Sequence, residues 1–378
     1  MVEISNKITA ILKMIENGDY FVINRPRQYG KTTTIYMLNR YLKTSDEYFP
    51  INMSFEGIGE EGFKNAVVFI DAFFLLLKTL FKKNGNDDLV KFLESSPPPD
   101  RIDKLGIWIS ELAIKIAKKP VLMIDEVDKS SNNQLFLDFL GMLRNKYLKR
   151  DEEGELTFHS VILAGVHDVK SLKLKFRSDA EAKYNSPWNI AVDFEVNLSF
   201  SAKEIESMLE DYAKEQQITM DIPFLAGKLF YFTSGYPFLV SLLCKTVDEK
   251  IMPGEQKRQW VLADLEKAFQ LILKKDNTNF ESLITNLENN QDLYDLVFKL
   301  VMNEMEFSFN RLNPLIAQGI LYGLLKEDEG KARIHNHVYE QLIYNYMTSK
   351  LETSGTAYLR SEKRKRPNQD MEDFGNGR

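Results

Sequence analysis

The strongest constraint on this chain is a short loop that follows an uncharged strand-like run and precedes a helix-like run. Residues 20–24 are apolar and residues 31–42 have helical character, with Gly30, Lys31 and Thr32 at the junction. The phosphate-loop pattern Gly-x-x-x-x-Gly-Lys-Ser/Thr is met except at its first position, where Arg25 replaces glycine. Because this loop needs a strand before it and a helix after it, the chain is expected to begin as an α/β domain.

The residue types in this loop suit a nucleotide triphosphate. Backbone N–H groups of residues 28–32 can wrap a phosphate at the helix N-terminus, where the dipole favours negative charge. Gly30 allows close approach, Lys31 reaches the β- and γ-phosphates, and the Thr32 hydroxyl can ligate Mg²⁺. Pro26 can stiffen the turn in place of the missing glycine. We expect Lys31 to face solvent in the absence of phosphate. The alternative is a surface turn that carries a lysine by chance.

A second apolar run, residues 121–124, ends in two carboxylates, Asp125 and Glu126. The carboxyl edge of a parallel sheet is where ligands bind. Asp125 is expected to hold Mg²⁺, usually through water, and Glu126 to orient and deprotonate the attacking water. Alone, such a pair is an ordinary strand exit, but together with the upstream loop it indicates nucleotide binding. Asp128 is interpreted as a solvated helix-start carboxylate.

Helical and strand-like segments alternate through the first half of the chain. The expected strands are 20–24, 49–55, 120–125, 160–166 and 190–194, and the expected helices are 5–16, 31–42, 62–83, 100–118 and 133–149. Continuous apolar runs, instead of period-two alternation, indicate a parallel sheet covered on both faces. From residue 201 to 350 nearly everything is helical, apart from a hairpin near 326–335.

Composition narrows the class of protein. The 378 residues allow two or three domains, and the net charge of −6 argues against general coating of nucleic acid. The one cysteine, Cys244, lies in an apolar helical run and is interpreted as a small core residue. No signal peptide and no apolar run long enough for a bilayer are evident, so a cytoplasmic protein without membrane contact is expected.

Several segments in combination resemble the bacterial and archaeal AAA-like ATPases related to the AAA+ and STAND groups. Residues 27–33 are similar to the family's Arg-Gln-x-Gly-Lys-Thr-Thr loop, in which the first glycine is commonly missing. The other matching segments are 122–128, 162–172, 186–194, 234–240 and 334–346. The resemblance covers roughly residues 20–347.

This resemblance implies a P-loop NTPase core (1–200), a helical lid (201–289), a winged-helix-like domain (290–350) and a polar tail or linker (351–378). It implies ATP and Mg²⁺ as cofactors and the following site: Glu126 and Lys31 as catalytic residues; Thr32 and Asp125 as metal ligands; Arg27, Gln28, Tyr29, Gly30, Lys31, Thr32, Thr33 and Pro237 around the nucleotide. Relatives often carry a PD-(D/E)XK nuclease-like domain. No such pattern follows Tyr346, so nuclease activity is not assigned.

Further candidates each have a plain structural alternative. His167 and Asp168 are either a sensor of the γ-phosphate or a polar loop start. Gly235-Tyr236-Pro237 resembles a lid motif of STAND-like proteins, although Gly can end one helix and Pro open the next. Arg144 and Arg177 are either arginine fingers for a neighbouring copy in a homo-oligomer or, by preference, solvated residues. His335 and His337 have strand-face spacing but lack further zinc ligands nearby.

The expected function is ATP hydrolysis that drives movement of the lid and winged helix. The alternative is a nucleotide-gated switch that binds nucleic acid, with DNA reached through the winged helix or the basic tail cluster (Arg360, Lys363, Arg364, Lys365 and Arg366). Basic residues of the winged-helix segment (Arg311, Lys326, Lys331 and Arg333) are offset by Glu327, Asp328 and Glu329. A scaffold without turnover is a third reading, against which the intact Lys31, Thr32, Asp125 and Glu126 stand.

Overall fold

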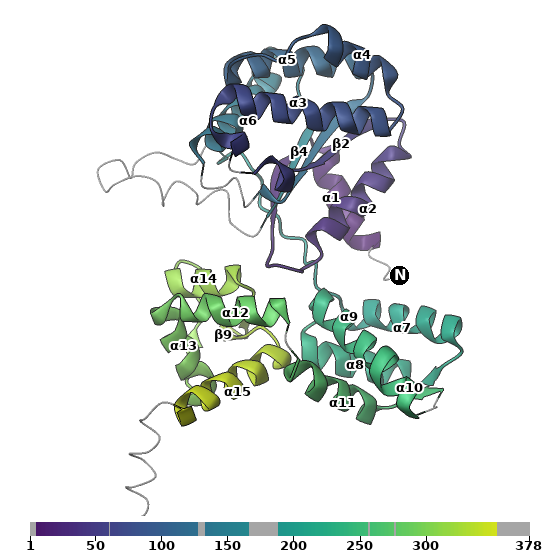
Figure 1. Ribbon diagram of the computed structural model, residues 1–378, viewed down its shortest axis with the longest axis vertical. Coiled ribbons are helices and arrows are strands. Elements are labelled where there is room, and N and C mark those ends of the chain that lie inside the picture. The colour runs from purple at the N-terminus through teal and green to yellow at the C-terminus, as the bar shows by residue number, and fades with distance from the viewer. Residues whose placement is uncertain are drawn as a thin grey trace, which may run out of the picture. The chain divides into compact units, whose positions relative to one another are not determined.

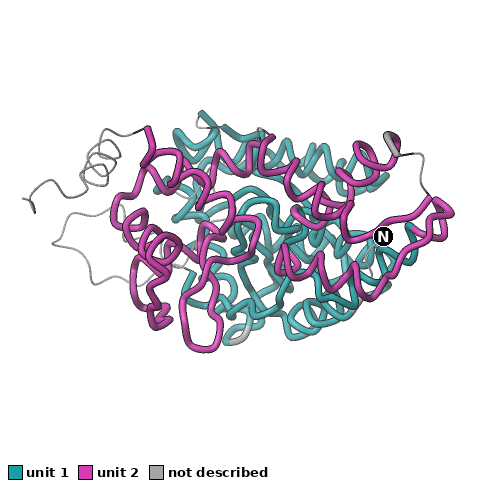
Figure 2. Tube along the Cα trace, turned by 90° about the horizontal axis from the view of Figure 1, so that it is seen from below, with its two compact units in different colours: residues 1–212, 236–238 teal, residues 213–235, 239–378 magenta. Residues whose placement is uncertain are grey.

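A computed structural model describes residues 5–59, 61–127, 133–165, 188–255, 258–275 and 277–353. The chain divides into two compact units (Figure 2). Unit 1 comprises residues 1–212 together with 236–238, and unit 2 comprises residues 213–235 and 239–378. The short piece 236–238 therefore belongs to unit 1 although its neighbours on both sides belong to unit 2.

Unit 1 is built on a four-stranded parallel sheet in the order β1-β4-β3-β2. Its strands are β1 (Tyr20–Asn24), β2 (Tyr48–Ser54), β3 (Lys119–Asp125) and β4 (Ser160–Gly165). The sequence prediction of these four strands and of a parallel sheet is confirmed within one residue at the described ends. The fifth expected strand, 190–194, is reduced to a single parallel bridge between Val192 and Phe21.

Helices connect these strands in the pattern that the sequence predicts. They are α1 (Ser5–Glu16), α2 (Lys31–Lys43), α3 (Ala66–Lys83), α4 (Asp87–Ser95), α5 (Ile102–Lys115), α6 (Gln134–Glu153) and α7 (Ala202–Gln216), with 3₁₀ turns η1 (Glu56–Ile58) and η2 (Glu61–Phe63). The helix expected from residue 62 begins later, because the Asn65 side chain caps α3 by accepting from the Val68 N–H. The nine-residue α4 was not predicted; a polar Asn84-Gly85-Asn86 turn isolates it from α3.

Successive strand residues point to opposite faces of the sheet, and both faces are covered. Tyr20 and Val22 on β1 belong to one large apolar core shared with α3, α5 and α6. Phe21 and Ile23, which alternate with them, are also buried but lie outside that core. Figure 1 shows α3, α5 and α6 on one side of the sheet and α1 and α2 on the other. Burial on both faces explains the uninterrupted apolar runs of β3 and β4.

Unit 2 is almost entirely helical. Its elements are β5 (Thr219–Met220), α8 (Ile222–Thr233), α9 (Pro237–Thr246, which starts in unit 1), a π-helical turn η6 (Val247–Ile251), α10 (Met252–Glu255), β6 (Gln259–Trp260), α11 (Leu262–Leu273), α12 (Thr278–Glu288), α13 (Gln291–Met302), β7 (Phe307–Ser308), α14 (Pro314–Leu321), β8 (Leu325–Asp328), β9 (Lys331–Ile334) and α15 (His337–Thr353). Strands β8 and β9 form the predicted hairpin, and β7 pairs with β9. In the described part of the chain, no helix combines the length and apolar character needed to cross a membrane.

Candidate functional site

The phosphate-loop segment and the acidic pair leave the sheet at the same edge. Asn24, the last residue of β1, is in register with Gly165 of β4, and Ile124 of β3 is in register with Leu163. The parallel strands β1, β4 and β3 therefore end together. Since β4 lies between β1 and β3, the loop and Asp125 start about 10 Å apart, at two strand spacings. This is the carboxyl edge, where open α/β sheets bind ligands.

The loop backbone turns sharply before it enters α2. Gln28 and Gly30 both have left-handed φ angles, of 57° and 84°. Gly30 is the N-cap residue of α2, no side chain caps that end, and the ladder starts with the Thr34 N–H donating to the Gly30 carbonyl at 2.9 Å. The first turn of a helix directs N–H groups that have no intrahelical acceptor outward, and its dipole attracts an anion. Thr32 and Thr33 are exposed in this first turn.

The Lys31 ammonium lies inside the loop. Its Nζ donates to the carbonyl oxygens of Arg25 at 2.9 Å and Pro26 at 3.0 Å, and the residue is only 8% exposed. The expectation that Lys31 faces solvent is therefore wrong. The ammonium group donates to main-chain carbonyl oxygens of its own loop, and these take the place of the water molecules that the sequence led us to expect around it.

Arg25, which stands in place of the first glycine of the pattern, points away from the loop. Its guanidinium donates to the carbonyl oxygens of Phe194 at 3.2 Å and Val196 at 2.9 Å. It also donates to the Asn24 carbonyl at 3.0 Å and lies 5.2 Å from the centre of the Phe194 ring. Arg25 thus joins the start of the loop to the segment after the bridge residue Val192. The sequence carries no signal of this pairing.

Two tyrosine rings meet at the middle of the loop, one from the loop itself and one from residues 236–238. Tyr29 is buried, and its ring meets that of Tyr236 edge-on with centroids 4.7 Å apart. The Tyr236 hydroxyl donates to the Arg27 carbonyl at 2.5 Å. A Cβ placed on Gly30 would lie 3.9 Å from Cγ of Pro237. Tyr236 and Pro237, two residues of the Gly235-Tyr236-Pro237 motif, therefore lie beside the phosphate loop.

Asp125 and Glu126 adopt different environments at the end of β3. Asp125 is 6% exposed, and its Oδ1 accepts from the Glu126 N–H at 2.9 Å. Its main-chain carbonyl accepts from the Phe55 N–H at 3.0 Å, which holds the strand end against β2. Glu126 is half-buried and has a left-handed φ of 57°. For a residue with a Cβ this backbone is strained, a feature that concentrates at functional sites.

The other residues that the sequence suggested for the site either lie apart from one another or are outside the residues that the structure describes. Asp128, His167, Asp168 and Arg177 lie outside the described residues. Arg144 donates from Nε to the Asn189 side chain at 2.9 Å. His335 and His337 have separate partners, because the His337 ring stacks on Phe232 and Phe269 and faces the Glu340 carboxylate at 3.2 Å, whereas His335 lies 3.3 Å from the Asn336 amide. The Cys244 thiol, in α9, has its pKa raised to about 12 by burial and is protonated at neutral pH.

The strand order, the parallel register and the loop between β1 and α2 define a P-loop NTPase fold. The chain belongs to the AAA-like domain family, whose model matches residues 4–345. No curated protein matches the sequence.

Among solved structures, a Walker-type ATPase of Pyrococcus abyssi superposes with a TM-score of 0.57 at 12% identity, over 91% of this chain and 96% of that one. The ORC2 protein of Aeropyrum pernix aligns with a TM-score of 0.45 at 12% identity, over 92% and 94% of the two chains. The Thermotoga maritima RuvB Holliday junction branch migration motor aligns with a TM-score of 0.41 at 12% identity, over 90% and 93%. At this identity the first likeness concerns the fold alone.

Proposed function

We propose that this protein binds ATP with Mg²⁺ and hydrolyses it. The observation that carries the proposal is the common sheet edge, where the loop after β1 and the carboxylates after β3 face the same region from two strands apart. The membership in the AAA-like family and the fold shared with a Walker-type ATPase of Pyrococcus abyssi support the same conclusion.

Each residue of the site has a task that its surroundings suit. Lys31 exchanges its bonds to the Arg25 and Pro26 carbonyls for phosphate oxygens, which are stronger, charged acceptors. Thr32 and Asp125 offer a hydroxyl and a carboxylate, the oxygen ligands that Mg²⁺ prefers. Mg²⁺ held by these two residues would neutralise part of the negative charge of the triphosphate. Glu126 orients the attacking water and takes its proton.

We further propose that the nucleotide state controls the helical part of the chain, with residues 201–289 as a lid and 290–350 as a winged-helix-like domain. The helix order α13, β7, α14, the β8–β9 hairpin and α15 supports the second assignment. Nucleic-acid binding through this hairpin is less well supported. Lys331 and Arg333 both pair with Glu306, and α14 carries no charged residue. A nucleotide-gated switch that binds nucleic acid therefore stays the alternative, with the basic tail as the other route to DNA.

The test is ATP turnover measured with Mg²⁺ and with EDTA, with and without duplex DNA, at several salt concentrations. Metal-dependent release of phosphate by the wild type, lost in Lys31→Ala, is the expected result. Turnover that needs DNA would favour the switch. Absence of both binding and hydrolysis of ATP under all these conditions would overturn the proposal in favour of a scaffold.

A further inference from the structure

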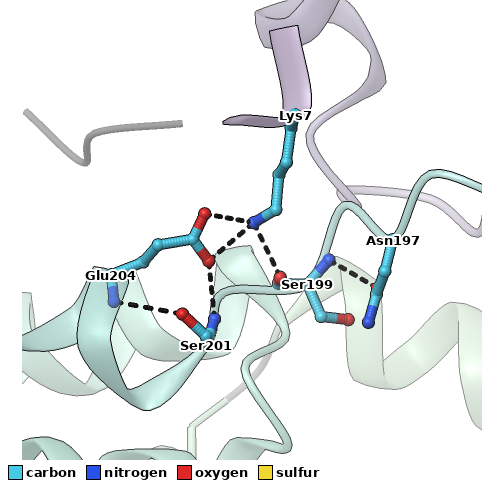
Figure 3. Close-up of polar contacts among 5 residues, drawn as sticks. All are labelled: Lys7, Asn197, Ser199, Ser201 and Glu204. Carbon is cyan, nitrogen blue, oxygen red and sulfur yellow. Dashed lines mark hydrogen bonds and ion pairs between the residues drawn. The ribbon is translucent and has the colours of Figure 1, made fainter. Parts of the chain in front are cut away.

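A network of polar contacts fixes Ser199, which lies just before α7 (Figure 3). The Ser199 N–H donates to the Asn197 side chain at 3.0 Å, and its carbonyl accepts from Lys7 of α1 at 2.8 Å. Lys7 also pairs with Glu204 at 2.7 Å, where both side chains are largely buried. The main-chain donor and acceptor of Ser199 are therefore each held by a different side chain.

The same network forms the start of α7. The Glu204 carboxylate accepts from the Ser201 N–H at 2.7 Å, and the Ser201 hydroxyl accepts from the Glu204 N–H at 3.2 Å. This reciprocal pair is a capping box, which defines where a helix begins. Because Glu204 also pairs with Lys7, the cap and the Ser199 turn are connected through one carboxylate. Residues 197–204 are thus a structured turn within unit 1.

The phosphate loop is attached to this turn by a bond between two hydroxyl groups. The Tyr29 hydroxyl and the Ser199 hydroxyl are in direct hydrogen-bond contact. Tyr29 stands between Gln28 and Gly30, the two loop residues with left-handed φ angles. A left-handed backbone conformation is unfavourable for a residue with a side chain, such as Gln28. Contacts with residues outside the loop are therefore needed to stabilise this conformation.

Arg25 supplies a second attachment to the same stretch of chain. Its bonds to the Phe194 and Val196 carbonyls lie only a few residues before Ser199. Burial raises the pKa of the Tyr29 hydroxyl, against a smaller opposite effect of the Ser199 bond. The hydroxyl is therefore protonated at neutral pH and can donate. The loop is thus hydrogen-bonded to residues 194–199 at two points, through Arg25 and through Tyr29.

We propose that the Tyr29–Ser199 bond is a positioning contact, which holds the loop backbone in its phosphate-binding shape and links phosphate binding to the turn that starts α7. The proposal rests on the proposed nucleotide function. Neither residue touches the reacting atoms in this role; both act through the loop backbone. By thermodynamic reciprocity, a phosphate that stabilises the loop must also stabilise the 197–204 turn.

The experiment compares the wild type with Tyr29→Phe, Ser199→Ala and the double variant. Each single variant removes the hydrogen bond between the two hydroxyl groups. In Tyr29→Phe the phenyl ring keeps its packing against Tyr236. The affinities for ATP and for tripolyphosphate, each with Mg²⁺, should both fall about 3- to 10-fold. The double variant should bind no more weakly than the weaker single variant, because both remove the same bond. Ser199→Thr, which retains a hydroxyl, should bind like the wild type.

Hydrogen exchange separates positioning from general stability. In the wild type, ATP should slow exchange of the Ser201 and Glu204 amides, whereas in Tyr29→Phe this protection should be much reduced. Tyr41→Phe, on the exposed face of α2, is the matched control and should change neither affinity nor protection.

Three outcomes overturn the proposal. The first is unchanged affinity in folded single variants, as judged by their melting temperatures. The second is a loss seen with ATP but not with tripolyphosphate, which would place the effect on the nucleoside. The third is additive losses in the double variant. A wild type that binds neither ligand would instead refute the nucleotide function itself, and this result is distinct from all three.

Discussion

The Nζ atom of Lys31 lies 2.9 Å from the carbonyl oxygen of Arg25, six residues earlier in the same loop. The lysine that defines the phosphate-loop pattern is thus held by main-chain oxygen atoms of the segment that it is expected to serve. Its side chain is already held within the loop, so little of its conformational freedom remains to be lost when phosphate oxygens replace these carbonyls. A side chain that is held before binding loses less conformational entropy when the ligand binds.

Lys31→Ala should abolish tight ATP binding while the protein stays folded. Loss of charged hydrogen bonds to phosphate is expected to weaken affinity at least about thirtyfold. Because Lys31 also bonds to two loop carbonyls, the free energy of unfolding should fall slightly, by about 1–2 kcal/mol. Calorimetric titration and thermal unfolding measure the two effects. Lys43→Ala, at the other end of α2, is the control and should bind ATP normally; retained affinity in Lys31→Ala would disprove the loop assignment.

Glu126→Gln separates an enzyme from a scaffold. Glutamine keeps the size of the side chain but cannot accept a proton at neutral pH, while Lys31 and Asp125 remain in place. Turnover should fall about a hundredfold or more, with ATP affinity preserved. Steady-state phosphate release and ATP titration on one preparation test this, with Glu111→Gln on the exposed face of α5 as control. Unchanged hydrolysis would remove Glu126 from the mechanism and make Asp128 or Asp168 the next candidate.

The position of a C-terminal truncation should matter. A cut after residue 353 preserves α15, and the melting temperature and ATP affinity should stay unchanged. A cut after Ser349 removes Lys350, which pairs with Glu288 at 2.7 Å and lies 4.7 Å from the centre of the Tyr294 ring. This exposed pair is worth less than about 1 kcal/mol, so only a small drop in melting temperature is expected. A large drop from the cut after residue 353 would contradict the prediction of a polar tail or linker, which the sequence placed at 351–378 and which can begin only after α15 ends at Thr353.

His335 should make unit 2 less stable in mild acid. Burial, with a smaller effect of the nearby Lys326 charge, lowers the pKa of His335 from 6.5 to about 4. Between these values the unfolded chain binds the proton and the folded chain does not. The free energy of unfolding is therefore unaffected by the titration of His335 above about pH 6.5. It decreases by up to about 3 kcal/mol as pH falls towards 4.

The comparison that tests this is denaturant unfolding of the wild type and His335→Gln from pH 7 to pH 4.5. The variant should lose less stability over this interval. The pKa of His159 in unit 1 is also lowered by burial, but His159 is present in both proteins and its contribution cancels. Identical pH slopes for the two proteins would show that His335 does not titrate as expected.

Local patterns predicted the elements of the sheet well, because each depends on few neighbours. The ends of β1 and β3 follow from apolar runs that stop at polar residues, Asn24 and Asp125. The expected strand at 190–194 was only partly right. Its last residue, Phe194, and Val196 beyond it direct their carbonyl oxygens to the Arg25 side chain and not to a neighbouring strand. Sequence spacing carries no information about such a contact.

The contacts around the loop depend on residues that are far apart in the sequence. Ser199 lies 170 positions from Tyr29, and Tyr236 lies 209 positions from Arg27. The Ser199 hydroxyl belongs to no pattern of known spacing. Tyr236 lies in the Gly235-Tyr236-Pro237 motif, but the motif does not indicate that its hydroxyl bonds to the Arg27 carbonyl. The environment of Lys31 was mispredicted for a related reason, since the path of the loop backbone, and not the residue type, decides whether the ammonium meets solvent.

The return of residues 236–238 to unit 1 has a practical consequence for dividing this protein. The chain passes between the units three times, at 212–213, 235–236 and 238–239. No single proteolytic cut can therefore release either unit complete, and no uninterrupted stretch of sequence encodes one alone. A fragment that ends at Tyr212 would retain the loop, the sheet and the carboxylates, yet would lack Tyr236, the donor to the Arg27 carbonyl. A version of unit 1 made by itself would therefore need residues 236–238 joined to residue 212 by a new connection.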